Sequence, residues 1–285
     1  MKKEIRLVNK VKRLIRRLGC PRWLHRYGPK KYEFLHHLTA LLVRFFCRLS
    51  YRRVKYLLDL MDLKCPSKSA LQYTAKKLNS GFWQRVLRVT SGKPYLVAID
   101  STGLSRTNPS YHYLRRIDGK FPKVPIKLSV AFDTKRKKFC AAKVRVLPAH
   151  DLRDARLLLD RSKPKIAMLD KGYNSERLCE YAFENRIAIM IPKKSNAKRG
   201  FHRKNMLKQF RLRTYHRRSL VESGNSSIKR KYGSSVSSKK ARTIRTEVYG
   251  RLACHNIFSY FLWRFRTELD FRKELFPFDV FFCSY

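Results

Sequence analysis

The feature that most constrains the fold is a series of short apolar runs between residues 94 and 192. Each run is too short for a buried helix and is bounded by turn residues, which is typical of buried strands. Amphipathic helical patterns separate the later runs, and Asp151 and Asn174 are their expected N-caps. The predicted order is three strands, a helix, a strand, a helix and a fifth strand, at 94–100, 126–133, 138–147, 150–161, 164–170, 175–186 and 187–192. This order indicates an α/β domain built on one sheet.

The chain before residue 94 has a different, helical period. Ile5, Val8, Val11 and Leu14 recur at three- and four-residue spacing, and a second apolar helix is expected at about 32–48. The stretch 50–79 then predicts a short helix, a turn, and a further helix with Ser67 as its N-cap. This helix-turn-helix pattern is compatible with a DNA-binding motif and equally with a helix pair that only packs against the rest of the protein.

Two more helical stretches follow the strands, at about 215–232 and 244–265. The predicted organisation is therefore an α-helical N-terminal region (1–93), an α/β domain (94–265) and a C-terminal tail (266–285). Between the fifth strand and the first of these helices, the basic segment 193–205 has no periodicity and is expected to be irregular.

The charge of the chain indicates the kind of partner. There are 67 Lys and Arg residues against 20 Asp and Glu residues, a formal charge of +47. Such an excess favours a polyanion, because basic side chains release counterions from phosphates when they bind them. No run of about 18 apolar residues, signal peptide or lipidation motif indicates a membrane. The seven cysteines are odd in number and lack CxxC spacing, which favours reduced thiols in a cytoplasmic protein over disulfides or a zinc site.

Two predicted strands end in a carboxylate, at Asp100 in VAIDSTG and at Asp170 in AMLDKGY. Ligands of open α/β sheets gather at such strand ends. If the strands are neighbours, the two carboxylates face one site, and a divalent cation would relieve their repulsion. Alternatively, each aspartate only forms a turn. Asp133 also ends a strand, but a polar hairpin turn follows it, so it is assigned to the turn.

The third candidate acid is Glu222, which lies in the cationic stretch YHRRSLVESGNSSIK. At about 100° per residue, Tyr215, Arg218, Glu222 and Lys229 fall on one stripe of a helix. An exposed Arg218–Glu222 pair would contribute only a few tenths of a kcal/mol, and it would leave the other two residues unexplained. The stripe favours a metal-assisted phosphoester site, in which Glu222 holds a cation and Arg218 and Lys229 reach DNA phosphates.

These motifs resemble the DDE transposases of bacterial and archaeal insertion sequences. The spacing Tyr215-x2-Arg218-x3-Glu222-x6-Lys229 fits the Y-R-E-K signature of one large group of that family. VAIDSTG is similar to the segment of the family's first acid, and AMLDKGYNS to that of its second. The resemblance covers about residues 94–262.

The resemblance implies a ribonuclease H-like fold and catalysis with two Mg²⁺ or Mn²⁺ ions. It carries Asp100, Asp170 and Glu222 over as catalytic acids and metal ligands. Some relatives have a long β-rich insertion before the Glu helix. Here only residues 193–214 lie in that interval, so no insertion domain is expected.

The function expected is a transposase that cuts the ends of its element and joins them to target DNA. In this account Tyr215, Arg218 and Lys229 contact DNA, the N-terminal region recognises terminal inverted repeats, and two copies act as a homodimer. Two alternatives remain open at this point: a catalytically silent DNA-binding protein derived from a transposase, and a ribonuclease H-fold nuclease that cuts without joining.

Overall fold

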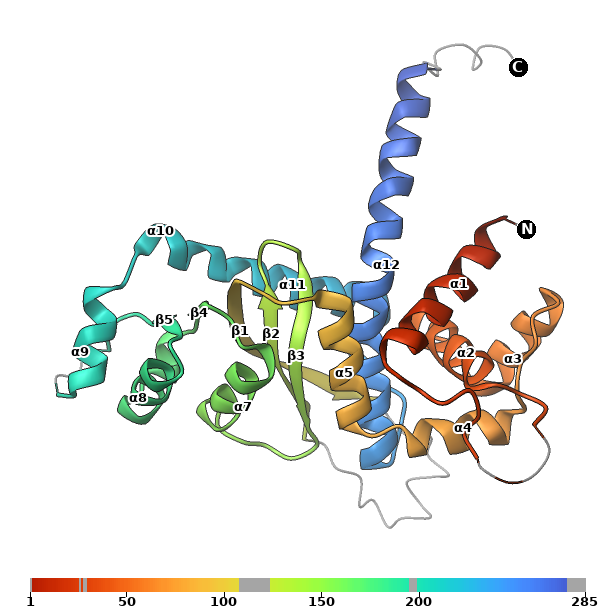
Figure 1. Cartoon of the computed structure of the whole chain (residues 1–285), viewed down its shortest axis with the longest axis horizontal. Helices are drawn as coiled ribbons and strands as arrows, with labels where there is room; N and C mark the ends of the chain where they lie inside the picture. Colours follow the sequence, from red (N-terminus) through yellow and green to blue (C-terminus); the bar gives the residue numbers. More distant parts are fainter. Residues whose placement is uncertain (1, 26, 28–29, 108–123, 195–198, 276–285) are drawn as a thin grey trace, which may run out of the picture.

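The centre of the molecule is a mixed β-sheet. The structure is a computed structural model that describes residues 2–25, 27, 30–107, 124–194 and 199–275 (Figure 1). Five strands are adjacent in the order β3-β2-β1-β4-β5. They are β1 (Leu96–Arg106), β2 (Ile126–Asp133), β3 (Lys138–Arg145), β4 (Ile166–Met168) and β5 (Ala188–Met190). The short strand β6 (Ser235–Val236) pairs with the far end of β1.

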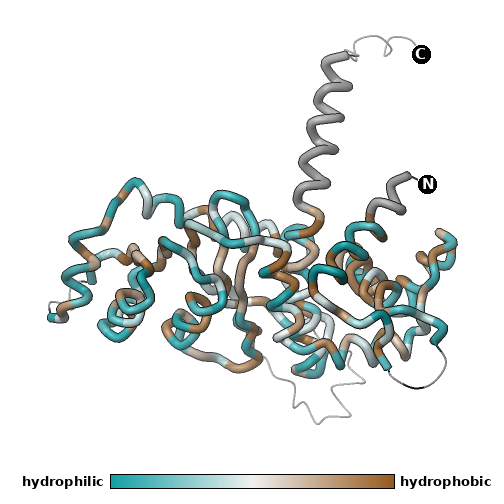
Figure 2. Tube along the Cα trace, in the orientation of Figure 1, coloured by the Kyte–Doolittle hydropathy of each residue, from teal (hydrophilic) through white to brown (hydrophobic). Residues whose placement is uncertain are grey.

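The directions of the strands complete the topology. β2 is antiparallel to both β1 and β3, whereas β4 is parallel to β1 and β5 is parallel to β4. Helices cover both faces of the sheet (Figure 1), and Figure 2 colours the chain by hydropathy, with hydrophobic residues in brown. Buried apolar residues of the strands pack against those of the helices on each face. The prediction of an α/β fold with a ribonuclease H-like core is confirmed by this order and these directions.

Alternation along β1 divides the core between two faces. Val97 and Ile99 are buried on the face covered by α7 (Leu152–Ser162) and α8 (Glu176–Glu184). Ala98 is buried on the opposite face, covered by α5 (Ser80–Ser91), α11 (Ser219–Tyr232) and α12 (Ala241–Leu275). Every second residue of β1 is therefore directed to α11, and Asp100 belongs to that set.

The N-terminal helices pack on the same core as the sheet. They are α1 (Lys2–Arg17), α2 (Phe34–Phe46), α3 (Tyr51–Leu60), α4 (Lys68–Lys77) and α5. One cluster joins buried side chains of α1, α2 and α5 to those of the sheet and α12. The Ser67 hydroxyl accepts from the Ala70 amide at 3.3 Å, so its predicted role as the N-cap of α4 is confirmed.

Two predicted helix caps are wrong. Asp151 precedes α7 without a capping hydrogen bond, because its carboxylate pairs instead with Lys127 at 2.5 Å. Asn174 does not cap α8 either. Its amide donates to the Pro192 carbonyl at 3.1 Å, and Ser175 takes the N-cap position.

The interval before the Glu222 helix is short and helical. It contains α9 (Phe201–Lys208) and α10 (Leu212–Tyr215), and no strand among its described residues 193–194 and 199–214, which agrees with the expected lack of an insertion. The expectation of irregular structure over 193–205 is wrong from Phe201 onward; residues 195–198 lie outside the described residues. Helix α9 begins there because the Glu176 carboxylate accepts from the amides of His202 and Arg203 at 2.8 and 3.2 Å.

The last helix is longer than predicted. Helix α12 continues to Leu275, past the expected end at 265, and the remaining tail residues 276–285 lie outside the described residues. No helix in the described part of the chain has the length and apolarity needed to cross a membrane. The six cysteines whose side chains the structure describes are all unpaired.

Candidate active site

The first predicted acid, Asp100, lies in the middle of β1 opposite Val130 of β2. Its side chain is 23% exposed and faces α11. One carboxylate oxygen accepts from the Asn225 amide at 3.1 Å, and the other lies 3.9 Å from an Arg218 nitrogen. Burial raises the pKa of Asp100 above its ordinary value, and Glu222 acts in the same direction, while Arg218 and Asn225 oppose the shift. The acid is therefore held in a partly desolvated position beside a cation.

The second acid, Asp170, reaches the same edge of the sheet. Strands β1 and β4 are parallel, and Ala98 of β1 pairs with Met168 of β4. Asp100 lies two residues after Ala98, and Asp170 lies two residues after Met168. That offset also directs both side chains to the α11 face. Asp170 is exposed, and one of its oxygens accepts from the Lys171 amide at 2.8 Å, so it also forms the turn considered as its alternative role.

The third acid, Glu222, is on α11 and is 54% exposed. Its Oε1 accepts from Arg218 Nη2 at 2.6 Å. The predicted single helix from Tyr215 is interrupted, because residues His216–Arg218 form a 3-10 turn between α10 and α11. Arg218 still lies beside Glu222 after this turn, so the predicted Arg218–Glu222 neighbourhood is confirmed.

Helix α11 lies unusually close to the sheet at Gly224. A Cβ atom at this position would be 3.0 Å from Cε2 of Phe132 on β2. The neighbouring residue Asn225 is 6% exposed, and its Nδ2 makes the hydrogen bond to Asp100 described above. The glycine therefore permits the close approach that places α11 against the first acid.

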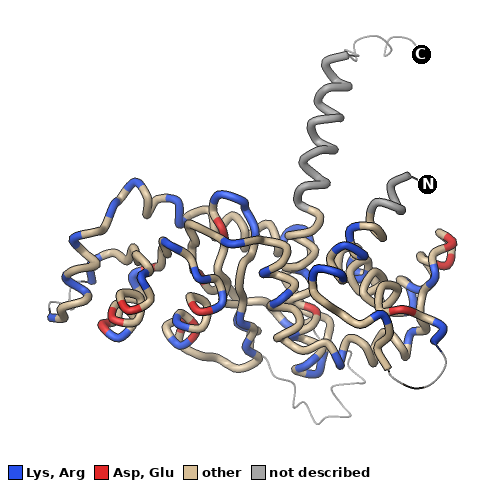
Figure 3. The backbone as a smooth tube through the Cα atoms, in the orientation of Figure 1, with Lys and Arg blue, Asp and Glu red and all other residues tan. Residues whose placement is uncertain are grey.

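The remaining cation of the signature, Lys229, faces solvent along the same helix. It lines a groove of 590 Å³ together with Glu222, Arg230 and three serines, Ser219, Ser223 and Ser226. Small hydroxyl side chains leave room in this groove for an incoming backbone. Figure 3 shows that Lys and Arg also follow α9 and α10, which lead to the site.

Arg218 is the electrostatic centre of the site. Burial lowers the pKa of this guanidinium, but Tyr215 and the three carboxylates of Asp170, Glu222 and Asp100 outweigh the burial and leave the pKa above its ordinary value. Burial raises the pKa of Tyr215, and Arg218 opposes that shift. All three predicted acids thus interact with one half-buried guanidinium.

The donor set suits a hard divalent cation. Mg²⁺ and Mn²⁺ prefer carboxylate oxygens, and three such groups surround Arg218. Among the described residues, no three His, Cys, Asp or Glu side chains lie close enough together to hold one ion in this arrangement. Among the same described residues, the buried Oδ1 of Asn225 also has no hydrogen-bond partner. The groups fit a metal site in their chemistry, with the Arg218 guanidinium as the cation between them.

A hydrogen-bond chain beneath the site was not predicted from the sequence. Ser101, next to Asp100, donates to Ser129 at 3.0 Å and contacts the Tyr173 hydroxyl at 3.2 Å. Ser129 donates to the buried Asp154, which Arg145 binds at 2.5 Å. Through Tyr173 this chain ties the turn after Asp170 to β1. Asn225 was also missed, although its position three residues after Glu222 places it on the same side of the helix.

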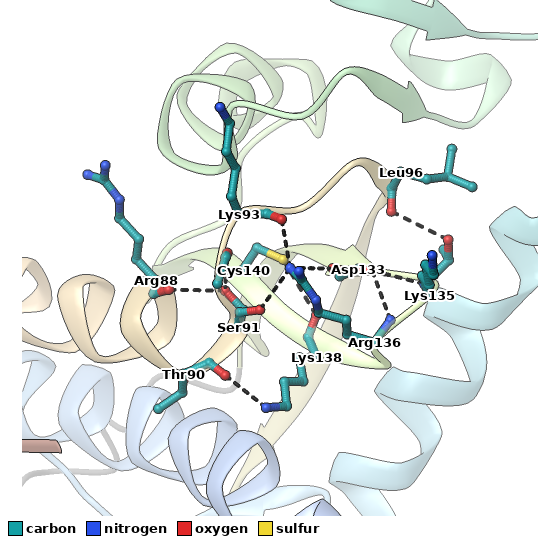
Figure 4. Close-up of polar contacts among 12 residues, drawn as sticks. Arg88, Thr90, Ser91, Lys93, Leu96, Asp133, Lys135, Arg136, Lys138 and Cys140 are labelled. Carbon is teal, nitrogen blue, oxygen red and sulfur yellow. Dashed lines mark hydrogen bonds and ion pairs between the residues drawn. The ribbon is translucent and has the colours of Figure 1, made fainter. Parts of the chain in front are cut away.

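Asp133 has no part in the site. Its carboxylate accepts from the amides of Lys135 and Arg136 at 2.9 and 3.0 Å, so its predicted turn role is confirmed (Figure 4). The Arg136 guanidinium then donates to the carbonyls of Ser91 and Lys93 at 3.3 and 2.6 Å. This network closes the end of the sheet remote from Asp170.

Comparison with known families shows to which protein family the chain belongs. A family model described as a transposase DDE domain matches residues 91–257, a range that contains all three acids. The chain belongs to this family. This transposase also aligns with two solved structures at low similarity. The first is a piggyBac transposase synaptic complex with hairpin DNA, at 11% identity and a TM-score of 0.45, with 89% of this chain and 71% of that chain covered.

The second solved structure is a pre-cleavage Mos1 transpososome. It aligns at 10% identity and a TM-score of 0.25, with 87% of this chain and 86% of that chain covered. No curated protein matches the transposase in sequence.

Proposed function

We propose that this transposase cuts the ends of a DNA element and joins them to target DNA by phosphoryl transfer, with Asp100, Asp170 and Glu222 as the catalytic acids. The observation that carries the proposal is the placement of the three acids. Arg218 lies 2.6 Å from Glu222 and 3.9 Å from Asp100, and the parallel register of β1 and β4 brings Asp170 to the same side of the sheet.

The three carboxylates would hold two Mg²⁺ or Mn²⁺ ions. When bound, such ions supply an activated water or 3′-hydroxyl nucleophile and stabilise the leaving oxygen. The chain's own part is to keep the acids ionised and in place. Asn225 holds the Asp100 carboxylate, and the Tyr173–Ser101 contact holds the turn that carries Asp170.

The cations of α11 would position the DNA. Lys229 lines the groove beside Glu222 and can pair with a phosphate there. Arg218 can exchange its carboxylate partners for a phosphate when metal arrives, and Tyr215 would contact the same strand. A formal charge of +47 makes DNA the expected polyanion. In this account the helical region 1–93 recognises the terminal repeats, and a homodimer brings two ends together.

The test uses a plasmid that carries the DNA from both sides of the reading frame. The wild-type protein should nick and release the segment in Mg²⁺. Asp100→Asn and Glu222→Gln should each lower the cleavage rate by at least about 100-fold, the scale expected when several kcal/mol of metal stabilisation is lost. Both variants should bind the DNA within about threefold of wild type. Glu184→Gln, which removes an exposed acid on α8, is the matched control.

Two results would support the alternatives. Binding of the end DNA without cleavage by the wild-type protein would identify a silent DNA-binding protein. Cleavage of the plasmid together with failure to join precut ends to a second DNA would identify a nuclease. Cleavage that survives Asp100→Asn or Glu222→Gln would overturn the assignment of the acids.

A further inference from the structure

A second cationic pocket lies away from the acids, where residues of the N-terminal helices and of the start of α12 line one cavity. Its volume is 610 Å³, and its walls come from the end of α2, the first turn of α3, α4 and the segment between β6 and α12. No Asp or Glu is among the described residues that line it. Six cations line it: Arg44, Arg48, Arg53, Lys76, Lys239 and Lys240.

Arg44 shows that the pocket is a built site rather than a loose group of surface charges. Its side chain is 7% exposed, and its guanidinium stacks on the Tyr51 ring at 4.1 Å from the centroid. The buried Nε has no hydrogen-bond partner within the described part of the chain. Burying a charged donor without an acceptor is costly, so this group is one that an incoming anion would satisfy.

Two helix N-termini reinforce the positive potential of the pocket. Helix α3 begins at its wall, where the Ser50 hydroxyl accepts from the Arg53 amide at 3.2 Å. Helix α12 begins on the opposite side, next to Lys240 and Thr243. Both helices are at least ten residues long, and each N-terminus carries partial positive charge that favours an anion.

A buried acid fixes the segment that supplies Lys239 and Lys240. The Glu247 carboxylate accepts from the amides of Ser237 and Ser238 at 3.2 and 2.9 Å and pairs with Arg251 at 2.6 Å. Glu247 pairs with Arg251 and also interacts electrostatically with Arg44, and neither Glu247 nor Arg251 lines the pocket. The two lysines therefore lie on a segment that Glu247 holds in place from the interior of the protein.

We infer that this pocket binds a phosphate of a duplex DNA backbone and so attaches one DNA molecule to both the N-terminal helices and the catalytic domain. The helix pair α3–α4 favours a DNA source over a small free anion. In helix-turn-helix proteins the first helix lies across the backbone while the second enters the major groove. Here α4 exposes Tyr73 by 64%, next to the pocket residues Gln72 and Lys76.

The inference rests on the proposed function only in taking DNA as the polyanion. None of the pocket residues lines the groove beside Glu222. A DNA phosphate bound in this pocket would contact both the N-terminal helices and the segment before α12. This shared contact would help to fix the position of the bound DNA end relative to the three acids.

The test measures the salt dependence of DNA binding in EDTA, so that no chemistry takes place. The probe is a fluorescent 20-base-pair duplex of mixed sequence, and its anisotropy is titrated at several salt concentrations. Arg53→Gln/Lys240→Gln removes one exposed cation from each side of the pocket. Because each phosphate contact contributes about 0.9 to the slope of log K against log salt and the pocket holds one phosphate, the magnitude of the slope should decrease by roughly 0.9.

The matched control is Arg153→Gln/Arg177→Gln, which removes two exposed cations from α7 and α8. Its slope should change by less than about 0.5. Equal slopes for the pocket variant and the control would overturn the inference, whatever the cleavage assay shows. Conversely, an Asp100→Asn protein that still cleaves would overturn the catalytic assignment and leave the salt result intact.

Discussion

At the scale of single residues, the site is organised around the Arg218 guanidinium, with which the carboxylates of Asp100, Asp170 and Glu222 all interact. Arg218 lies 2.6 Å from Glu222 and 3.9 Å from Asp100, and Asp170 also contributes to its field. Without this guanidinium the three carboxylates would repel one another at the edge of the sheet. We therefore interpret Arg218 as the counter-ion of these carboxylates.

This interpretation predicts the effect of Arg218→Gln on Asp100. Arg218 favours the ionised carboxylate, so its removal should raise the pKa of Asp100 further above its ordinary value. The low-pH limb of the cleavage profile should then move to higher pH. An NMR titration of the Asp100 carboxyl carbon checks the shift directly. Arg217→Gln, at the exposed neighbouring position, should leave the titration unchanged; an unchanged titration in Arg218→Gln would contradict the interpretation.

A second prediction concerns stability. Because the folded-state pKa of Asp100 is raised, ionising it costs free energy in the folded protein. The cost is absent below the unfolded-state pKa and complete above the folded-state pKa. Asp100→Asn should therefore raise Tm at pH 7. Calorimetry at pH 7 and pH 3 measures it, and a gain that persists at pH 3 would rule out this cause.

At the scale of elements, the site depends on how closely α11 approaches the sheet. Gly224 allows this approach, and Asn225 on the same helix donates a hydrogen bond to Asp100. The strand that carries Asp100 is held from its other face by the Ser101–Tyr173 contact. The three acids are thus placed by one glycine-mediated helix contact and by the parallel register of β1 and β4.

Gly224→Val tests the role of that contact. The new side chain would meet the Phe132 ring, which already packs against Phe139 at a centroid distance of 5.0 Å and cannot retreat freely. Overpacking of this kind costs about 1–3 kcal/mol. Urea unfolding should show this loss, and cleavage should decrease at least tenfold because Glu222 moves with α11. Ser226→Val, at an exposed position of the same helix, should change the unfolding free energy by less than about 0.5 kcal/mol.

The sequence predicted the elements whose signals are local. The strands that carry or precede Asp100 and Asp170, and the helix carrying Glu222, follow from apolar runs and spacing. The predicted end of the first strand at Asp100 is wrong, because β1 stays paired with β2 beyond Asp100 and continues to Arg106. The failures have non-local causes. Helix α9 is capped by Glu176 from another helix. The Asp151 carboxylate forms an ion pair with Lys127 instead of the expected capping hydrogen bond. The position of Arg218 among all three acids also depends on tertiary packing that no spacing encodes.

At the scale of the whole molecule, the N-terminal helices and the sheet share a core. Gly250 of α12 lies so close to α2 that a Cβ atom there would overlap the Phe45 ring. The buried Trp83 of α5 packs against the same ring at a centroid distance of 6.1 Å. The helical region is therefore not a loosely tethered module, and DNA bound to it would be held in a fixed relation to the acids.

This shared core predicts cooperative unfolding. Tryptophan fluorescence and far-UV circular dichroism should give one coincident transition in urea. Gly250→Leu should lower the free energy of unfolding by about 2 kcal/mol or more, because the Phe45 ring has no room to move. Two separate transitions in the wild-type protein would contradict the shared core.

The central claim is that the converging acids hold catalytic metal ions, and a change of metal preference tests it most directly. A thiolate binds Mn²⁺ in preference to the harder Mg²⁺. Asp170→Cys should therefore lose cleavage of end-containing plasmid in Mg²⁺ by at least about 100-fold and recover at least about tenfold when Mn²⁺ replaces Mg²⁺. Asp170→Ser, which lacks the thiolate, should remain inactive with both ions. Wild-type activity of Asp170→Cys in Mg²⁺ would contradict the claim.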